Sequence, residues 1–516
     1  MNTKLKYFRL FLFVLFLVRW DPAYSEEKGE KASKSTETEA DKKSCQEKEE
    51  YNETKHRIIV QGQSIDYTAV AGTLILNNDK CQPKASMFYI SYTKDGEEAK
   101  SNRPITFCFN GGPGSSSIWL HLGILGPKRV DLNENGDALP PYHLTDNEFS
   151  LLDTTDLVFI DPISTGFSRA IPVGEADKYY GTQEDIKIIA EFIRLYITRF
   201  HRWESPKFIV GESYGTTRAA ALAGYLHDNM YIYTNGLVFI STVLNFQSID
   251  FAAGNDLPYL LILPSYTATA WYHKKLSAPL QSNFLDTFQK AKEFVINEYS
   301  LALFKGDALS SSEKKYIAKQ IAQFTGLTPE YVERSNLRID TSHFTKELLR
   351  NEKRTVGRFD SRFKGIDANL VGEYFEYDPS LDVIIGAFTS TFNQYVATEL
   401  QWKKEEPYEV LAEIYSKWDY GSRNQYLNVA ETLRSVLTKN PFLRTFVANG
   451  YFDLATPIYA TEYTFNHLGL DPTLLNHITM KNYDAGHMMY IYRPSLIQLK
   501  KDLTQFYHDT LEDQNK

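Results

Sequence analysis

Ser213 lies in the sequence GESYG at residues 211–215, directly after the apolar run 207–210. The pattern G-x-S-x-G is typical of a serine on a tight turn between a strand and a helix, where its hydroxyl can attack a carbonyl carbon. The apolar run predicts the strand, and the alanine-rich segment 215–229 predicts the helix. In this context we interpret Ser213 as the nucleophile of an acyl-transfer reaction.

A nucleophilic serine needs a general base, and the base needs a carboxylate that orients it. In a strand-turn-helix site of this kind, the chain order is serine, acid, histidine. Among the histidines after Ser213, His487 stands out because Gly486 permits a tight loop before it. Asp453 lies on a loop just after the predicted strand 443–448. Alone, Asp453 is equally compatible with a turn cap and His487 with a structural role, but together with Ser213 they predict a catalytic triad.

The sequence FNGGPGSSS at residues 109–117 has few side chains and leaves backbone N–H groups accessible on a turn. Such a turn can hold a phosphate or the oxyanion of an acyl-transfer reaction. Neither G-x-x-x-x-G-K-[ST] nor G-x-G-x-x-G fits here, which argues against phosphate binding. With a nucleophile further along the chain, we expect the N–H groups of Gly112 and Tyr214 to form an oxyanion hole.

Short apolar runs bounded by turn residues predict the strands that must position these groups. The runs are residues 85–92, 104–110, 156–162, 207–213, 236–241 and 442–450. Helical patterns at 182–200 and 215–229 separate some of them, so we expect a mostly parallel sheet with helices on both faces. The arrangement predicts an α/β-hydrolase fold, with the catalytic residues at the carboxyl edge of the sheet.

The rest of the chain divides by composition. Residues 254–399 have a mainly helical pattern without strand partners, which predicts a helical insertion, or cap, between core segments 56–253 and 400–516. We expect the insertion to cover the active-site edge and to set side-chain preference without contributing catalytic groups. Residues 26–55 are charged and nearly free of large apolar groups, which predicts a flexible leader.

Residues 1–25 combine basic residues up to Arg9, an apolar run at 10–18 and small residues at 23 and 25. This pattern is typical of a signal peptide, with an uncleaved membrane anchor as the alternative. Cleavage predicts an exported protein, periplasmic or extracellular, without stable membrane association.

The charge and the cysteines limit the partners. The formal charge is −9, and loss of the signal peptide, which carries +3, leaves about −12 without a dense basic cluster. Nucleic acid and anionic membrane surfaces are therefore not expected as partners.

Three cysteines imply no disulfide framework, although pairing of Cys45 with Cys81 stays open. The sequence contains no visible metal-ligand cluster or cofactor motif, and it does not indicate an oligomeric state.

Five blocks of the sequence resemble the serine carboxypeptidase family, peptidase family S10, and within it the bacterial carboxypeptidase-related branch. In chain order the blocks are NGGPGSSS, VFIDPISTGFS, VGESYGTTRAAALAGYL, NGYFDLATP and AGHMMY. The resemblance covers about residues 105–494 and implies a serine-type carboxypeptidase that acts on peptides or proteins without a cofactor. It implies Ser213 as nucleophile, His487 as base and Asp453 as orienting acid.

By position, the resemblance also implies how the substrate is held. Gly112 and Tyr214 match the oxyanion donors of the family. Asn110, Gly111 and Glu212 match the groups that bind the C-terminal carboxylate of the substrate. Glu212 can hydrogen-bond a carboxylate only if one of the two carries a proton, which would link peptide cleavage to mildly acidic pH.

Three positions depart from the family pattern. Ile124 stands where many members have a glutamate that pairs with the glutamate of the nucleophile motif, here Glu212. Ser115 replaces a cysteine, and Ser164 replaces a glycine. These changes leave the triad intact, and with apolar Ile124 beside the loop we expect Glu212 to stay protonated into the weakly acidic range.

Three classes of function fit these residues. The first is an exported serine carboxypeptidase, which we favour. The second is another acyl-transfer enzyme on the same triad, an esterase, an endopeptidase or an acyltransferase, because a fold alone does not determine the substrate. The third is a non-catalytic binding protein that keeps the scaffold.

Overall fold

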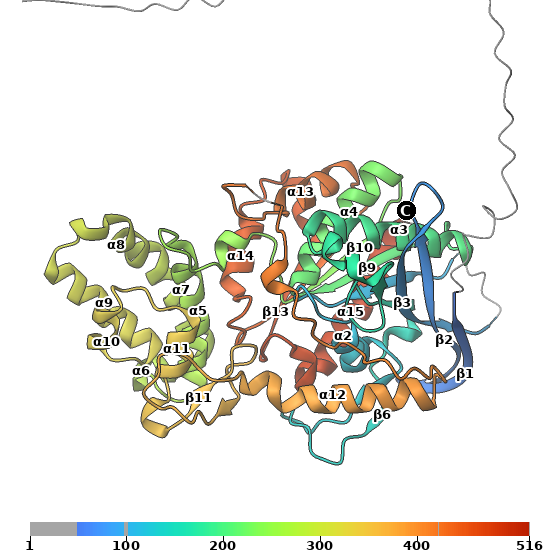
Figure 1. Ribbon diagram of the computed structural model, residues 1–516. Helices are drawn as coiled ribbons and strands as arrows, with labels where there is room; N and C mark the ends of the chain where they lie inside the picture. Colours follow the sequence, from blue (N-terminus) through green and yellow to red (C-terminus); the bar gives the residue numbers. More distant parts are fainter. Residues whose placement is uncertain (1–48, 97–101, 422, 515–516) are drawn as a thin grey trace, which may run out of the picture. The chain divides into compact units, whose positions relative to one another are not determined.

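The computed structural model describes residues 49–96, 102–421 and 423–514 (Figure 1). The predicted signal peptide, residues 1–25, lies outside these ranges, and so does Cys45. Neither the signal peptide nor a pair between Cys45 and Cys81 is therefore tested. Within the described ranges, no helix is both long and apolar enough to cross a membrane.

A ten-stranded sheet forms the centre of the described chain, in the order β1-β2-β3-β7-β4-β9-β10-β13-β14, with β8 paired to β3. The first strands pair antiparallel, and from β7 onward each neighbour is parallel. This confirms the predicted mostly parallel sheet of an α/β-hydrolase. The strands are β1 (Tyr51–Val60), β2 (Gln63–Asn77), β3 (Pro83–Lys94), β4 (Ile105–Phe109), β7 (Asp156–Ile160), β8 (Arg169–Ala170), β9 (Lys207–Glu212), β10 (Gly236–Ile240), β13 (Arg444–Gly450) and β14 (Ile478–Tyr483).

The beginning of the sheet differs from the expectation. Strand β1 starts at Tyr51, inside the predicted leader 26–55, and runs antiparallel to β2. Every second side chain of the first half of β1 is exposed, as expected for an edge strand. Its polar composition therefore resembles that of a leader, although the backbone is part of the sheet.

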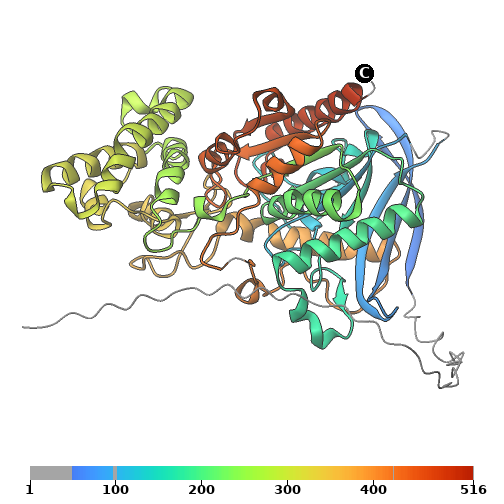
Figure 2. The same ribbon diagram turned by 90° about the horizontal axis from the view of Figure 1, so that it is seen from above.

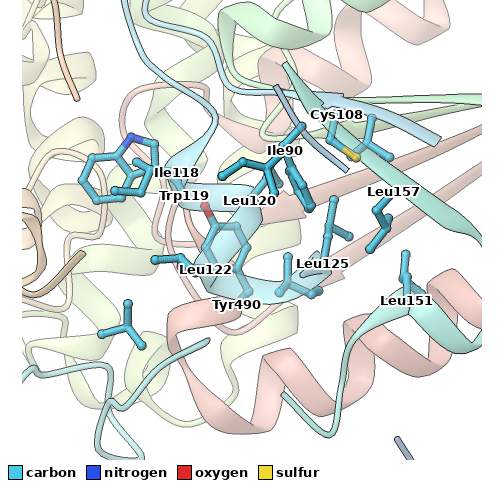
Figure 3. Packing of buried hydrophobic residues seen from close by; sticks show 14 of the residues in the cluster. Ile90, Cys108, Ile118, Trp119, Leu120, Leu122, Leu125, Leu151, Leu157 and Tyr490 are labelled. Carbon is cyan, nitrogen blue, oxygen red and sulfur yellow. The ribbon is translucent and has the colours of Figure 1, made fainter. Parts of the chain in front are cut away.

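The parallel strands place their side chains in two cores, one on each face of the sheet. On β4, Phe107 and Phe109 belong to the first core and Cys108 to the second, as the two-residue period of a strand requires. Figures 1 and 2 show the layers of sheet and helices, and Figure 3 shows side chains of the second core. Over the first core lie α3 (Thr182–Arg199), α4 (Tyr214–Met230) and α13 (Ala430–Lys439); over the second lie η1 (His121–Leu125), α12 (Pro379–Thr398) and α15 (Arg493–Gln514).

The helices between β10 and α12 have an apolar core of their own. Leu454, which precedes α14 (Ile458–Asn466), and Tyr459 in its first turn join this core and connect it to the main body. Helix α12 lies at the end of the predicted insertion but packs in the second core of the sheet. The helices of the separate core are α5 (Leu257–Tyr272), α7 (Phe284–Phe294), α8 (Ser300–Lys305), α9 (Ser311–Thr325), α10 (Pro329–Arg334) and α11 (Thr341–Glu347).

Arg218, one turn into α4, connects the elements that carry the site. Its side chain is fully buried, its Nε donates to Asp185 of α3 at 2.7 Å, and an Nη donates to the carbonyl of Asn110 at 2.6 Å. The guanidinium also lies 5.2 Å from the ring centroid of Phe109 and 5.3 Å from that of Tyr214. One cation therefore fixes α3, α4 and the glycine-rich loop after β4 with respect to one another.

Replacement of Arg218 by methionine should destabilise the fold by about 3–5 kcal/mol, because it leaves the Asp185 carboxylate buried without its partner. The second change, Asp185→Leu, should recover most of that loss in the double variant. Chemical denaturation of the wild type, both single variants and the double variant measures the coupling. If the double variant is as unstable as the sum of the two single variants, the pair does not act as a unit.

Candidate active site

Ser213 lies on the turn between β9 and α4, in a backbone conformation that L residues rarely adopt, with φ of 81° and ψ of −121°. Its N–H donates to the carbonyl of Ile240 on the next strand at 3.0 Å. A Cβ on Gly211 would lie 2.1 Å from the carbonyl oxygen of Gly215, so only glycine fits there. The tight turn that the pattern G-x-S-x-G predicts is present.

The structure brings the other two predicted triad residues together. Nδ1 of His487 and Oδ2 of Asp453 are 2.8 Å apart, and both side chains are buried. The Asp453 carboxylate also accepts hydrogen bonds from the N–H groups of Ala455 at 2.7 Å and Thr456 at 2.9 Å, and from the Thr456 hydroxyl at 2.6 Å. These donors fix the carboxylate so that it orients the imidazole.

Besides burial, three charged groups affect the pKa of His487: Asp453 and Glu212 raise it, and Arg358 lowers it. Burial lowers its pKa, but the Asp453 carboxylate, the hydrogen bond to it and the negative charge of Glu212 outweigh burial, and the pKa ends above its ordinary value. An imidazole with a raised pKa binds a proton more tightly, which suits a base that must hold the proton of a serine hydroxyl.

A segment at residues 357–362, within the predicted insertion, holds the histidine loop. The backbone N–H of His487 donates to the carbonyl of Phe359 at 2.6 Å, and their rings lie 4.8 Å apart between centroids. The N–H of Gly486 donates to Asp360 at 3.0 Å. A Cβ on Gly486 would lie 2.4 Å from the carbonyl oxygen of Phe359, so the contact depends on glycine. No motif in the sequence indicated this segment.

The predicted oxyanion donors lie on two turns in backbone contact. A Cβ on Gly111 would lie 2.5 Å from the backbone nitrogen of Tyr214, so the glycine-rich loop rests directly on the nucleophile turn. Tyr214 is the first residue of α4, where an N–H has no acceptor within the helix. Among the described residues, the N–H of Gly112 also has no backbone acceptor. Both N–H groups are thus available to a ligand.

Glu212, next to the nucleophile, is buried and accepts two hydrogen bonds from neutral groups. The amide of Asn110 donates to Oε1 at 3.0 Å, and the hydroxyl of Tyr490 donates to Oε2 at 2.7 Å. Burial raises the pKa of Glu212 to about 7, against the opposing effects of His487 and of the two donors. The predicted protonation of Glu212 into the weakly acidic range agrees with this value.

Tyr490 is the site residue that sequence reasoning missed. Tyr490 gives Glu212 a hydrogen-bond partner, whereas Ile124, at the position of the family's glutamate, is buried in the core on η1. A Cβ on Gly123 would lie 2.3 Å from the Tyr490 ring, so Gly123 makes room for it. Figure 3 shows Tyr490 among the apolar side chains of this core. Burial raises the pKa of its hydroxyl well above the ordinary value, so Tyr490 donates as a neutral phenol.

The two serine departures have separate surroundings. Ser115 accepts a hydrogen bond from the indole of Trp119 at 3.0 Å. Ser164 has a φ of 68°, a conformation that favours glycine and explains why a glycine was expected there. Its hydroxyl bonds to that of Tyr180 at 2.9 Å. Neither serine contacts the triad.

One cleft of about 880 Å³ brings many of these groups together. Ser213 and His487 line it, together with Asn110, Gly111, Gly112, Glu212 and Tyr214. Phe246, Leu411, Tyr415 and Tyr420 give it an aromatic and apolar wall. No group of three potential metal ligands occurs in the part of the chain that the structure describes. A serine, a histidine and free backbone N–H groups on one lining are the kinds of group that nucleophilic acyl transfer uses.

Known proteins resemble this chain in sequence and in fold. The family model for serine carboxypeptidases matches residues 62–495. Serine carboxypeptidase-like 20 of Arabidopsis thaliana is 31% identical over 137 residues, which span only 26% of this chain and 26% of that protein. Serine carboxypeptidase-like 35 of the same plant is 22% identical over 407 residues, or 75% of this chain and 74% of that protein.

A solved structure supports the fold. The crystal structure of a prohormone-processing carboxypeptidase from Saccharomyces cerevisiae superposes with a TM-score of 0.54 at 17% identity, over 86% of this chain and 91% of that chain. At this identity the likeness concerns the fold alone. These relatives are from a plant and a yeast, so the bacterial branch stays a prediction.

Replacement of Glu212 by glutamine should change how stability depends on pH. The pKa of Glu212 rises on folding from 4.5 to about 7, so the native state holds this proton more tightly and stability falls as the pH rises through that interval. The variant lacks this loss. As the pH rises from about 4 to about 8, its free energy of unfolding should therefore increase relative to that of the wild type by up to about 3 kcal/mol. Chemical denaturation at both pH values measures it, and a constant difference between the proteins would contradict the buried proton.

Proposed function

Because the chain belongs to the serine carboxypeptidase family, we propose that it hydrolyses C-terminal peptide bonds through a covalent acyl-enzyme on Ser213. One observation carries the proposal: His487 and Asp453 are paired at 2.8 Å in the same cleft as the strained turn of Ser213. A buried acid–histidine pair facing a serine on such a turn is the arrangement that nucleophilic acyl transfer requires.

In the proposed reaction, Ser213 Oγ attacks the carbonyl carbon of the scissile bond while His487 accepts its proton. Asp453 keeps Nδ1 of the imidazole protonated and stabilises the imidazolium that forms. The N–H groups of Gly112 and Tyr214 stabilise the oxyanion of the tetrahedral intermediate. His487 then gives the proton to the leaving amine, and a water molecule repeats the same steps on the acyl-enzyme.

We propose that the groups beside the nucleophile recognise the C-terminal carboxylate of the substrate. The amide of Asn110, the N–H of Gly111 and a protonated Glu212 would bind the terminal carboxylate, since an ionised Glu212 would repel it. The reaction also needs a neutral His487. The two groups interact, so they titrate as a pair, and cleavage of free-acid peptides should have a bell-shaped pH profile.

We also propose that the enzyme acts outside the cytoplasm, periplasmic or extracellular. The basic, apolar and small residues of positions 1–25 support export with cleavage of a signal peptide. Its substrates there would be peptides or proteins with a free C terminus.

Replacement of Ser213 by alanine should leave the fold intact and lower kcat for a peptide by roughly 10⁴- to 10⁶-fold, since nucleophile and base act as a unit. A fluorophosphonate probe should label the wild type and not the variant. Mass spectrometry of a peptide mixture should show stepwise loss of C-terminal residues with the wild type only.

Peptides with an amidated C terminus serve as the control for end recognition. Trimming that stops on amidation supports a carboxypeptidase, whereas internal cuts would indicate an endopeptidase. Equal labelling of wild type and Ser213→Ala would contradict the assignment of the nucleophile.

Replacement of Tyr490 by phenylalanine should change how kcat/KM for a peptide with a free C terminus depends on pH. The fall in activity on the alkaline side, the alkaline limb of the profile, should move to higher pH. The Tyr490 hydroxyl favours the ionised form of Glu212, so its loss raises the pKa of Glu212 and keeps that carboxyl protonated further. Profiles of kcat/KM for a free-acid peptide measure the shift, and an ester without a free carboxylate is the matched control. A limb that stays in place or moves to lower pH argues against Glu212 as the carboxylate receptor.

A further inference from the structure

The catalytic cleft continues into a second cavity of about 1360 Å³. Arg358 lines both, at the junction between the nucleophile and the helical region. Among the described residues, Arg358 is the one lysine or arginine on either lining. The cationic group of the cleft is therefore a single side chain at a defined place.

The backbone around Arg358 is held from two sides. Its N–H donates to the carboxylate of Asp378 at 3.2 Å, and its carbonyl accepts from the N–H of Leu454 at 3.0 Å, next to the triad acid. The guanidinium lies 5.3 Å from the ring centroid of Phe359, the ring that contacts His487. A rigid support thus presents this cation close to the catalytic base.

The guanidinium of Arg358 has no carboxylate partner within the described chain, in contrast to those of Arg362 and Arg350. Arg362 pairs with Asp360 at 2.6 Å, and Arg350 pairs with Glu347. A half-buried arginine beside a binding cleft can form strong, bidentate hydrogen bonds to an incoming carboxylate.

Among the described residues, none of the acidic side chains that line the two cavities forms an ion pair with Arg358, and each has other surroundings. Glu212 is bound by its two neutral donors. Asp340, on the second cavity, accepts from the backbone N–H of His343 at 3.0 Å and contacts its Nδ1 at 2.8 Å. Asp250, also on the lining of the second cavity, is exposed and forms no ion pair among the described residues. The charge of Arg358 thus remains available to a ligand.

We propose that Arg358 binds a carboxylate of the substrate beside the scissile bond, so that the enzyme selects peptides with an aspartate or glutamate there. The inference rests on the proposed peptidase function of the same cleft. The bound carboxylate is an acidic side chain on one side of the scissile bond, since the terminal carboxylate is assigned to Asn110, Gly111 and Glu212, and the experiment shows on which side it lies.

Three pairs of peptides test the proposal, each measured as a ratio of kcat/KM. They compare Glu with Gln before the scissile bond, Glu with Gln after it, and a free C terminus with an amide. The wild type should favour the carboxylate by roughly 10- to 100-fold in at least one of the two Glu/Gln pairs, whereas the ratio of free acid to amide, set by Asn110, Gly111 and Glu212, should not change in the Arg358 variants. Arg358→Gln should abolish the ratio in that pair, and Arg358→Lys should keep part of it. Arg354→Gln is the matched control, because Arg354 lines neither cavity.

A second measurement does not depend on turnover. N-acyl glutamate should slow fluorophosphonate labelling of Ser213 at lower concentration than N-acyl glutamine in wild type, and Arg358→Gln should remove the difference. If wild type is labelled and protected but cleaves no peptide, the peptidase proposal fails and the carboxylate site stands. If Arg358→Gln changes neither Glu/Gln ratio and leaves protection unchanged while labelling is normal, the carboxylate proposal is overturned.

Discussion

The glycine-rich loop after β4 and the nucleophile turn after β9 touch backbone to backbone, and the site depends on this contact. The two strands are parallel neighbours, with Phe109 opposite Gly211, so their carboxyl ends deliver both turns to one point. No side chain fits between the turns at Gly111. Arg218 holds the two turns together. It lies on α4, the helix that follows the nucleophile turn, and it donates a hydrogen bond to the carbonyl of Asn110 in the glycine-rich loop. Sheet order, glycine and one buried cation together place the proposed oxyanion donors.

The central strands could be predicted, and the three residues of the candidate triad could be picked out, because each depends on neighbours in the sequence. A short apolar run before GESYG, or a glycine before His487, is a local signal. The edge strand β1 was missed because its polar, exposed side chains resemble a leader. Tyr490 was missed because it is 278 residues from Glu212, and the two meet only in the folded chain. The position of α12 in the sheet's core was equally out of reach, since an apolar stripe does not say which core it joins.

The surroundings of Glu212 show how a buried carboxyl can be held without a second titrating group. Two carboxyls in contact share a proton and titrate as a coupled pair. A phenol whose pKa lies far above neutrality always donates, so the hydrogen bond to Glu212 persists in both of its protonation states. The coupling that remains is with His487, across the nucleophile. The protonation of the carboxyl is thereby linked to that of the catalytic base.

The contacts of residues 357–362 bear on how such enzymes diversify by recombination. A crossover that exchanged the whole helical region up to α12 would also replace the carbonyl that holds His487 and the carboxylate that holds Gly486. An exchange that ended before β11 (Thr355–Val356) would renew the separate helical core and leave the catalytic loops with their original support. Viable hybrids would therefore have their junctions on the amino-terminal side of β11, and the substrate-facing Arg358 would be inherited with the host's catalytic machinery rather than with the donor's helices.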